Sequence, residues 1–273
     1  FENRFFRADT SGIHNRLDLS FFPEGSTINS WGANVFDVYL NDTKGTRIYH
    51  QLGPGFNLGF DTNRFGLSYT DYTEILRPQD FPGIVSNKRF DYDNWQLSFN
   101  NSTLSTLEFG VRYRAGKTLN LVPAAENLPA VADTSRIDID VLWRPIDRLR
   151  VDNTYLLTEL ETREGGIKAF TNEIIRSNWN YQFTKELSLR FIAQYEETDS
   201  GPASRLKDNK NLNFDLLLRY VINPWSAFYV GYNSNQSNFD IVEVEGEREV
   251  IASSDLRRDG DQLFVKFSYL FQR

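Results

Sequence analysis

The chain has 273 residues, 40% of them hydrophobic, and a formal net charge of −7 at pH 7. This negative charge, with no basic cluster anywhere, excludes a nucleic-acid-binding protein, and no run approaches the ~18 to 20 apolar residues of a membrane-spanning helix. The mean hydropathy of −0.49 still permits a membrane β-barrel, because the polar residues that face the inside of a barrel lower the average.

The amino-acid usage is rich in aromatic residues, with 22 Phe, 13 Tyr and 5 Trp, and contains neither Met nor Cys. A chain without Met and without a signal-peptide pattern in residues 1–10 is expected to be a processed or truncated piece of a longer protein. The absence of Cys is compatible with an outer-membrane barrel held together by its strand ladder. The sequence predicts no cofactor and no metal site.

Alternation of apolar and polar residues with a period of two recurs along the whole chain and predicts an all-β protein with about thirteen or fourteen strands. The clearest segments, in chain order, are residues 19–22, 35–40, 56–60, 65–69, 94–99, 106–114, 136–143, 148–157, 174–183, 187–195, 212–220, 227–232 and 262–273.

The predicted connections alternate between short and long. The short ones are residues 61–64, 100–104, 145–148, 184–186 and 222–226, and the long, polar ones are residues 77–89, 117–135, 159–172, 196–211 and 233–261. This order predicts an up-and-down antiparallel meander with tight turns at one end. It is typical of outer-membrane barrels, whose short turns are periplasmic and whose long loops are extracellular.

The two faces of the predicted strands separate a membrane barrel from a soluble, lipocalin-like one. About thirteen strands would enclose a space too wide for side chains to fill, so the apolar face is expected to point outward and the polar face inward. Tryptophans beside the short turns and tyrosines about nine residues further along suggest two girdles roughly 23 Å apart, close to the ~25 Å apolar band of such barrels. These residues are Trp31, Trp143 and Trp225, and Tyr39, Tyr113, Tyr195 and Tyr232.

The inward parity carries many charged residues that are candidates to line the lumen. They are Arg112, Arg114, Asp138, Asp140, Arg144, Arg150, Asp152, Arg176, Arg190, Asp215, Arg219 and Lys266. Rings of charged side chains select solutes in pores. A ladder of ion pairs that stiffens a closed or plugged lumen accounts for the same residues equally well.

The final strand has aromatic and aliphatic residues at alternate positions, with Val265, Phe267, Tyr269 and Phe271 on one face. Phe264 and Leu270 break the pattern. The stretch resembles the C-terminal signal that the barrel-assembly machinery of the bacterial outer membrane reads.

Two weaker features were weighed as chemical sites. His14 and His50 are the only histidines, and residues 14–20 hold the residue types of a Ser-His or Asp-His barrel hydrolase, which are too common to be a signal. Residues 241–251 alternate around Gly246 and predict a projecting hairpin. Its glutamates, together with residues 259–261, are candidates for binding divalent cations at lipopolysaccharide, although an acidic, solvated edge that deters strand pairing is the preferred interpretation.

Several stretches resemble a family of bacterial outer-membrane proteins of unassigned function, in which a family-9-like carbohydrate-binding domain precedes a large barrel. The stretches that carry the resemblance are residues 178–195, 223–234 and 262–273, with 53–56 and 143–149. The resemblance implies a missing upstream portion, and it supplies no catalytic residues.

The sequence thus predicts a single outer-membrane β-barrel unit over residues 1–273, in a Gram-negative bacterium, as part of a larger barrel. A porin-like pore or transport channel, with sugars as candidate solutes, is the leading hypothesis. An anchor or scaffold for a carbohydrate-binding module or partner protein is the second, and a barrel hydrolase the third. The expected partners are membrane lipid and lipopolysaccharide, the barrel-assembly machinery, and upstream strands or another membrane chain, but no nucleic acid.

Overall fold

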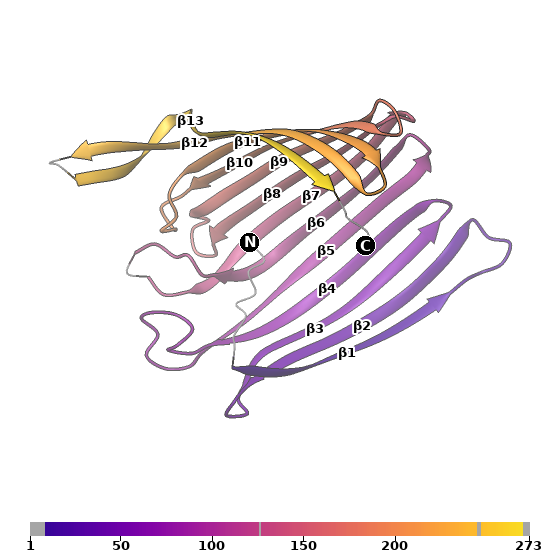
Figure 1. Ribbon diagram of the computed structural model, residues 1–273. Coiled ribbons are helices and arrows are strands. Elements are labelled where there is room, and N and C mark those ends of the chain that lie inside the picture. Colours follow the sequence, from indigo (N-terminus) through magenta and orange to yellow (C-terminus); the bar gives the residue numbers. More distant parts are fainter. Residues whose placement is uncertain (1–8, 126, 245–246, 270–273) are drawn as a thin grey trace.

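The computed structural model describes residues 9–125, 127–244 and 247–269, which form one antiparallel sheet (Figure 1). Its strands are β1 (Thr10–Phe21), β2 (Ile28–Asp42), β3 (Arg47–Phe60), β4 (Asn63–Leu76), β5 (Lys88–Leu104), β6 (Leu107–Asn120), β7 (Ala130–Ile146), β8 (Leu149–Thr162), β9 (Lys168–Gln182), β10 (Leu187–Ser200), β11 (Asn209–Asn223), β12 (Ser226–Val244) and β13 (Glu247–Tyr269). None of the described residues forms a helix long and apolar enough to cross a membrane.

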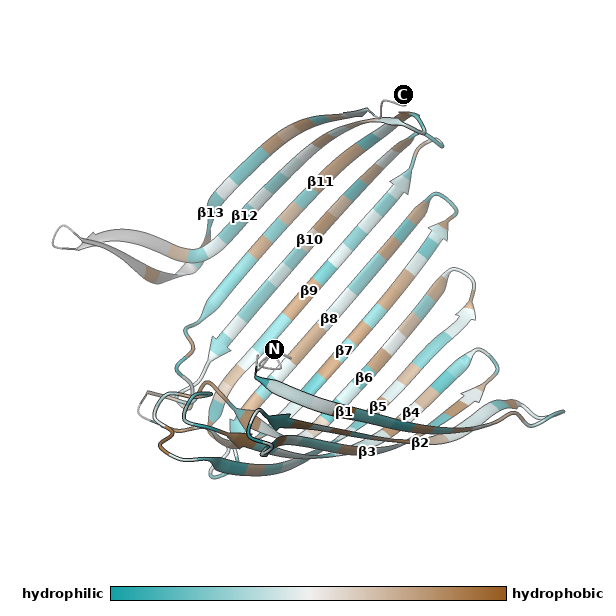
Figure 2. Ribbon diagram, turned by 60° about the horizontal axis from the view of Figure 1, so that its bottom comes forward, coloured by the Kyte–Doolittle hydropathy of each residue, from teal (hydrophilic) through white to brown (hydrophobic). Residues whose placement is uncertain are grey.

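The sheet has the up-and-down order that the alternating connections predict. Thirteen strands follow one another from β1 to β13, and each pairs with its sequence neighbours. The sheet curves strongly (Figures 1 and 2). Within the described part of the chain, β1 and β13 do not pair with each other, so the sheet is not closed. The sequence also leads us to expect that residues 1–10 pair with the closing strand or with another partner, and residues 1–8 lie outside the described ones.

At one end of the sheet the connections between strands have two to six residues, and the three longest connections, residues 77–87, 121–129 and 201–208, lie at the other end (Figure 1). The connections at residues 43–46 and 163–167 also lie at that second end and are short, so the predicted alternation of short and long connections holds only in part. The strands are longer than predicted: residues 100–104 belong to β5, and most of residues 233–261 belong to β12 and β13. A fourteen-residue strand such as β4 covers roughly 35 Å at ~3.3 Å per residue and ~40° tilt, which exceeds a ~25 Å apolar band. The ladder therefore continues beyond the length of such a band.

The register sorts the side chains of all strands onto two faces. We call the face that carries Arg112, Asp138 and Arg190 the polar face, and the face that carries Phe191 and Leu216 the apolar face. Figure 2 shows hydrophobic and hydrophilic residues alternating along the strands. On the apolar face large side chains remain open to the surroundings, and Leu263 and Val265 are 71% and 64% exposed. This face is not a folded core.

Two glycines explain aromatic residues that interrupt the alternation. Phe264 lies on the polar face opposite Gly231, where a Cβ on the glycine would meet its ring at 2.2 Å. Phe36 covers Gly53 in the same way at 2.3 Å. The absent side chain leaves room for the ring, which covers the exposed glycine backbone. Phe264 breaks the alternation within β13, but the glycine opposite it on β12 accounts for its position.

Candidate functional site

The candidate functional site is the polar face of the sheet. The register places every predicted inward residue on it. These are Arg112, Arg114, Asp138, Asp140, Arg144, Arg150, Asp152, Arg176, Arg190, Asp215, Arg219 and Lys266. They fall into two groups that differ in how their charges are compensated.

On β6, β7 and β8 the charges are paired. Asp138 is buried and accepts hydrogen bonds from Arg112 on β6 at 3.2 Å and from Arg136 at 2.7 Å. Arg150 binds Asp152 through both carboxylate oxygens at 2.8 to 3.2 Å. These bidentate and cross-strand pairs hold the side chains in defined positions. This part of the face agrees with the stiffening-ladder interpretation.

Other predicted residues on these strands are also held by neighbours. Arg144 donates to Glu108 at 2.6 Å, and Thr154 donates to Asp140 at 2.9 Å. Arg114 donates to Gln96 at 2.9 Å. Asp140 is held by a neutral hydroxyl and keeps its charge, but most of the charged side chains on the polar face of β6 to β8 lie in ion pairs.

On β9, β10 and β11 the three predicted arginines are unpaired, whereas Lys168 and Lys210 near the long-loop end form ion pairs with Asp199 and Glu197. Arg176, Arg190 and Arg219 are exposed, and in the described ranges none of them makes an ion pair or a side-chain hydrogen bond. Asp215, the carboxylate nearest along β11, accepts a hydrogen bond from Asn233 at 2.6 Å. On β13, Lys266 lies 6.0 Å from the centre of the Tyr229 ring.

A hollow of about 780 Å³ lies against the polar face at its short-turn end. Its walls come from β2 to β8 and contain mostly small or neutral polar residues, with a few charges. Those that belong to the polar face include Ser30, Gly59, Arg64, Asn100, Ser102, Glu108, Gly110, Asp140, Asp152 and Thr154. Asn, Ser and Thr side chains donate and accept hydrogen bonds without carrying charge, which suits hydrated, hydroxyl-bearing solutes.

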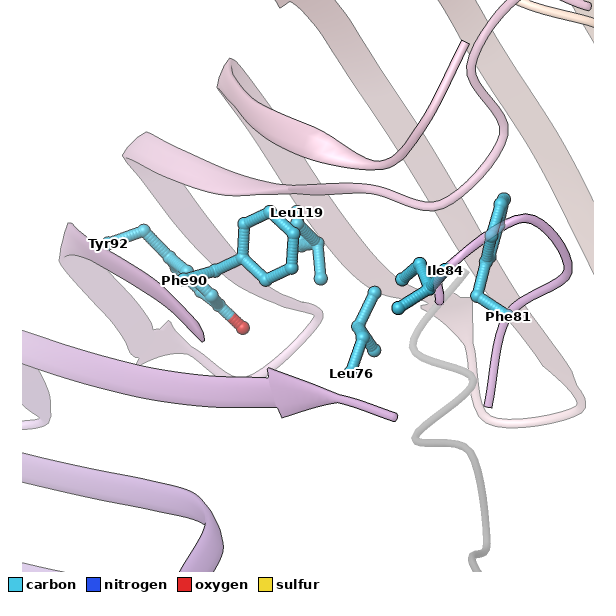
Figure 3. Packing of buried hydrophobic residues seen from close by; sticks show 6 residues of the cluster. All are labelled: Leu76, Phe81, Ile84, Phe90, Tyr92 and Leu119. Carbon is cyan, nitrogen blue, oxygen red and sulfur yellow. The ribbon is translucent and has the colours of Figure 1, made fainter. Parts of the chain in front are cut away.

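At the long-loop end the polar face is covered by an apolar cluster. Phe90 and Tyr92 on β5 pack with Leu119 at the end of β6 and with Phe81 and Ile84 from the β4–β5 connection, residues 77–87 (Figure 3). Each of these side chains is at most 9% exposed. The connection therefore folds back over the sheet and does not extend away from it.

A second buried cluster lies beside the first. Leu160 on β8 and Phe170 on β9 pack with Ala132 and Ala169, and they are covered by Val122, Ala203 and Leu206 from two further connections. Those connections, residues 121–129 and 201–208, bind each other through backbone hydrogen bonds: Ala124 to Ala203 at 3.2 Å and Arg205 to Val122 at 3.2 Å. The guanidinium of Arg205 also lies 5.5 Å from the centre of the Phe81 ring. We call residues 77–87, 121–129 and 201–208 together the loop cap.

Two glycines allow the loop cap to fold inward. Gly116 has φ of +142°, and a Cβ there would lie 2.6 Å from the Asn94 Cα; it is the last residue of β6 that pairs with β5. Gly201 donates to the carbonyl of Ala169, and a Cβ would lie 2.1 Å from the Lys168 carbonyl oxygen. Any larger residue at either position would push the loop away from the sheet.

Arg77 fastens the loop cap to the first strands. It is buried and donates to Asp80 at 2.8 Å and to Asp9, just before β1, at 3.0 Å, with Asp42 at 3.8 Å. The hydrogen bonds with Asp80 and Asp9 raise the pKa of Arg77 above its ordinary value, and the bond from Arg77 lowers the pKa of Asp9. The connection after β4 is thus tied to the start of β1.

The two histidines lie on opposite faces. His50 Nε2 is 2.7 Å from Asp37 Oδ1, but this pair lies on the apolar face with Leu52; His14 lies on the polar face of β1. In the described ranges, no Ser or Thr hydroxyl is hydrogen-bonded to either histidine. The described residues also contain no group of acidic and histidine side chains that suits a metal ion.

The proposed assembly signal and the acidic hairpin are partly described. Val265, Phe267 and Tyr269 lie on the apolar face of β13, more than half exposed, and pair with β12; Phe271 is outside the described residues. The backbone of residues 239–244 pairs with residues 247–252, which is the predicted hairpin, and it projects beyond the neighbouring strands (Figures 1 and 2).

The sequence interpretation missed the loop cap. It treated residues 77–89, 117–135 and 196–211 as polar loops, yet each contributes apolar residues to a buried cluster. A signal was present in the strands themselves. On β5 the large apolar residues change face, from Trp95 and Leu97 on the apolar side to Tyr92 and Phe90 on the polar side.

No protein-family model and no curated protein matches this chain. Among solved structures, similarity is found to outer-membrane expressed OmpT of Vibrio cholerae, with 9% identity over 95% of this chain and 97% of that one and a TM-score of 0.40. A Pseudomonas aeruginosa FadL homologue has 11% identity, coverage of 84% and 71%, and a TM-score of 0.34. The Pseudomonas putida toluene transporter TodX has 10% identity, coverage of 86% and 83%, and a TM-score of 0.29. Similarities this distant assign neither a family nor an activity.

Proposed function

We propose that this chain crosses the bacterial outer membrane and forms the wall of a pore or transport channel. The apolar face contacts lipid, the polar face lines the passage, the tight turns are periplasmic and the long connections are extracellular. The observation that carries the channel proposal is the 780 Å³ hollow on the polar face. Most of the residues that line it are polar, which suits a water-filled passage.

The membrane location is supported by the exposed apolar residues. Ile175 and Trp179 on β9 and Leu216 and Leu218 on β11 are 36% to 47% exposed, and they share one face. In water, a contiguous apolar surface of this extent promotes association. In a bilayer it meets hydrocarbon, and the polar side chains of the other face meet the aqueous interior.

The part of the hollow on β2 to β8 favours hydrated, hydroxyl-bearing solutes such as sugars. Ser30, Asn100, Ser102 and Thr154 offer hydroxyl and amide groups to a solute, and among the described residues the polar-face part of the lining contains no aromatic ring. The sugar assignment agrees with the carbohydrate-binding domain that the family resemblance implies upstream.

Closure of the barrel is part of the proposal. In hydrocarbon each unpaired backbone N–H or C=O group costs several kcal/mol, so β1 and β13 must find partners. We propose that these come from upstream strands or from another membrane chain. The barrel-assembly machinery, reading Val265, Phe267, Tyr269 and Phe271, would then insert the complete structure among membrane lipid and lipopolysaccharide.

A second function, that of a membrane anchor for a carbohydrate-binding module or partner protein, is favoured by the loop cap. Residues 77–87, 121–129 and 201–208 cover part of the polar face at its extracellular end. A passage obstructed by these loops would hold a partner at the surface without conducting. The two functions differ in whether the cap leaves an opening.

Conductance of the full-length protein in a planar bilayer decides between them. A channel should give discrete, reproducible conductance steps, and the cap variant Gly201→Val should give larger steps because the docked loop is displaced. Folded protein that inserts without conducting, in both forms, would refute the channel and support the anchor. Folding is verified independently by the resistance of the sheet to protease.

The orientation has its own test. A membrane-impermeant thiol reagent applied to intact cells should label a cysteine placed at Lys207 in the long connection and spare one at Lys185 in a tight turn. The chain contains no cysteine of its own, so each variant gives one signal. The reverse labelling pattern would contradict the topology.

A further inference from the structure

The three unpaired arginines of β9, β10 and β11 share one region of the polar face. Arg190 pairs in register with Asn180 on β9 and with Leu217 on β11, which places Arg219 two residues further along the same face. Arg176 pairs with Gln194. We call Arg176, Arg190 and Arg219 the arginine strip.

The residues between these arginines carry no charge. Asn178, Asn180 and Gln182 on β9 and Ser188 and Gln194 on β10 lie on the same face, and all can donate hydrogen bonds to an anion. The strip is therefore a cationic surface set among neutral side chains, which also include the apolar Ile192 and Leu217.

Carboxylates border the strip without neutralising it. Asp215 is held by Asn233 at 2.6 Å, and Asp152 on β8 is held by Arg150. Glu196 lies beyond Gln194, towards the long-loop end, and none of the three forms an ion pair with the strip. On β6 to β8, by contrast, Asp138 and Glu108 bind their arginines directly.

We propose that the arginine strip is an anion-recognition surface and that the preferred solutes of the channel carry carboxylate or phosphate groups. Arginine presents a planar fork of donors that matches both anions bidentately, and here that fork is not occupied by a protein carboxylate. This inference rests on the proposed channel function and specifies its substrate class. Arg112 is not part of this surface, because it is already bound to Asp138.

The first test measures ion selectivity of the full-length protein in planar bilayers under a potassium chloride gradient at low salt. Wild type should favour chloride, and the triple variant Arg176→Gln, Arg190→Gln, Arg219→Gln should lower the chloride-to-potassium permeability ratio by about twofold to fourfold, because fixed charges act on ions within a Debye length. Replacement of the same arginines by lysine should keep the wild-type ratio.

The matched control neutralises an existing ion pair on the polar face. Arg16 and Asp18 on β1 bind each other at 2.8 Å, so the variant Arg16→Gln, Asp18→Asn leaves the net charge unchanged and should leave the ratio unchanged. A conducting channel whose ratio does not respond to the triple glutamine variant, or a wild type that favours potassium, would overturn the inference while leaving the channel proposal standing.

A second measurement does not need conduction. In folded, detergent-solubilised protein, phenylglyoxal should modify Arg176, Arg190 and Arg219 faster than the bidentately bound Arg16 and Arg150, and inorganic phosphate should slow the modification of the strip selectively. Silent bilayers with phosphate protection would refute the channel and retain the anion surface. Equal reactivity of all five arginines, with no effect of phosphate, would refute the anion surface.

Discussion

The part of the sheet that we propose crosses the membrane and the long-loop end place their apolar residues on opposite faces. On β9, Ile175 and Trp179 lie on the apolar face and are exposed, whereas Phe170, nearer the long-loop end, lies on the polar face and is buried. The same change occurs on β5 between Trp95 and Tyr92. The crossing part depends on a surrounding lipid phase, while the loop end has a buried core like that of a water-soluble protein.

This difference shows where a strand leaves the proposed membrane. Where a strand stays paired but its apolar residues move from the apolar face to the polar face, its surroundings change. Below that point the apolar face meets lipid, and above it the apolar residues are buried on the polar face under the loop cap. On β5 the change occurs at Asn94, the residue that pairs with the glycine where β6 departs. The proposed bilayer boundary and the base of the loop cap therefore coincide there.

The largest effect is expected from a substitution that disrupts the buried core at the long-loop end. Phe170→Ala removes a ring that is 8% exposed and should weaken docking of the loop cap by about 3 to 5 kcal/mol, as deletion of a buried phenylalanine does. Residues 121–129 and 201–208 should become cleavable by protease while the sheet stays intact. The control is Ile175→Ala on the same strand, whose side chain is 47% exposed; equal cleavage of both variants would contradict a localised core.

A somewhat smaller effect is expected on the lipid-facing side. Phe191→Arg should lower the free energy of unfolding in lipid vesicles by about 2 to 4 kcal/mol, the cost of an arginine facing hydrocarbon near the bilayer midplane. Ile192→Arg, one residue further on and on the polar face opposite Asp215, should cost much less. Comparable losses for the two variants, measured by urea titration, would reverse our assignment of the faces.

The smallest expected effect is a pH dependence of the loop cap. Asp208 accepts hydrogen bonds from the Ser200 hydroxyl and from the Ser200 backbone N–H, which lower the pKa of Asp208 below its ordinary value. A carboxyl group with a depressed folded-state pKa stabilises the fold above its unfolded pKa of ~3.9, and the contribution is lost as the pH falls through the folded value.

Hydrogen exchange measures this loss. Protection of residues 201–208 should be constant from pH 6 to about 4 and decline below that value. Asp208→Asn should show reduced protection at pH 6 and converge with wild type at low pH. A difference between the two proteins that persists unchanged to pH 2.5 would exclude this carboxylate as the cause.

Much of the crossing part could be predicted from sequence, because period-two alternation in segments such as residues 187–195 encodes both the strand and its faces. The thirteen strands, the alternating connections and the projecting hairpin follow from that pattern. The loop cap could not be predicted in the same way. Its contacts, such as Arg205 with Phe81 and Ala124 with Ala203, join residues roughly 80 to 120 apart in connections whose local sequence carries no period.

The division of the polar face into paired and unpaired arginines could not be predicted from the sequence either. Arg112 and Arg176 have the same residue type and the same parity, but only Arg112 has an aspartate opposite it, at Asp138. Which arginine is compensated depends on register between strands, and hydropathy alternation alone does not fix the pairing of individual polar residues.

The most direct test of the central claim, that the apolar face meets lipid and the polar face meets water, uses spin labels on β10. Residues 1–273 contain no cysteine, so in the reconstituted full-length protein, with any upstream cysteine replaced, single cysteines at residues 189 to 194 each carry one label. Accessibility to oxygen should be high at 189, 191 and 193, and accessibility to a water-soluble nickel reagent should be high at 190, 192 and 194, with the two profiles out of phase. Profiles that rise and fall together, or oxygen maxima at 190, 192 and 194, would contradict the account.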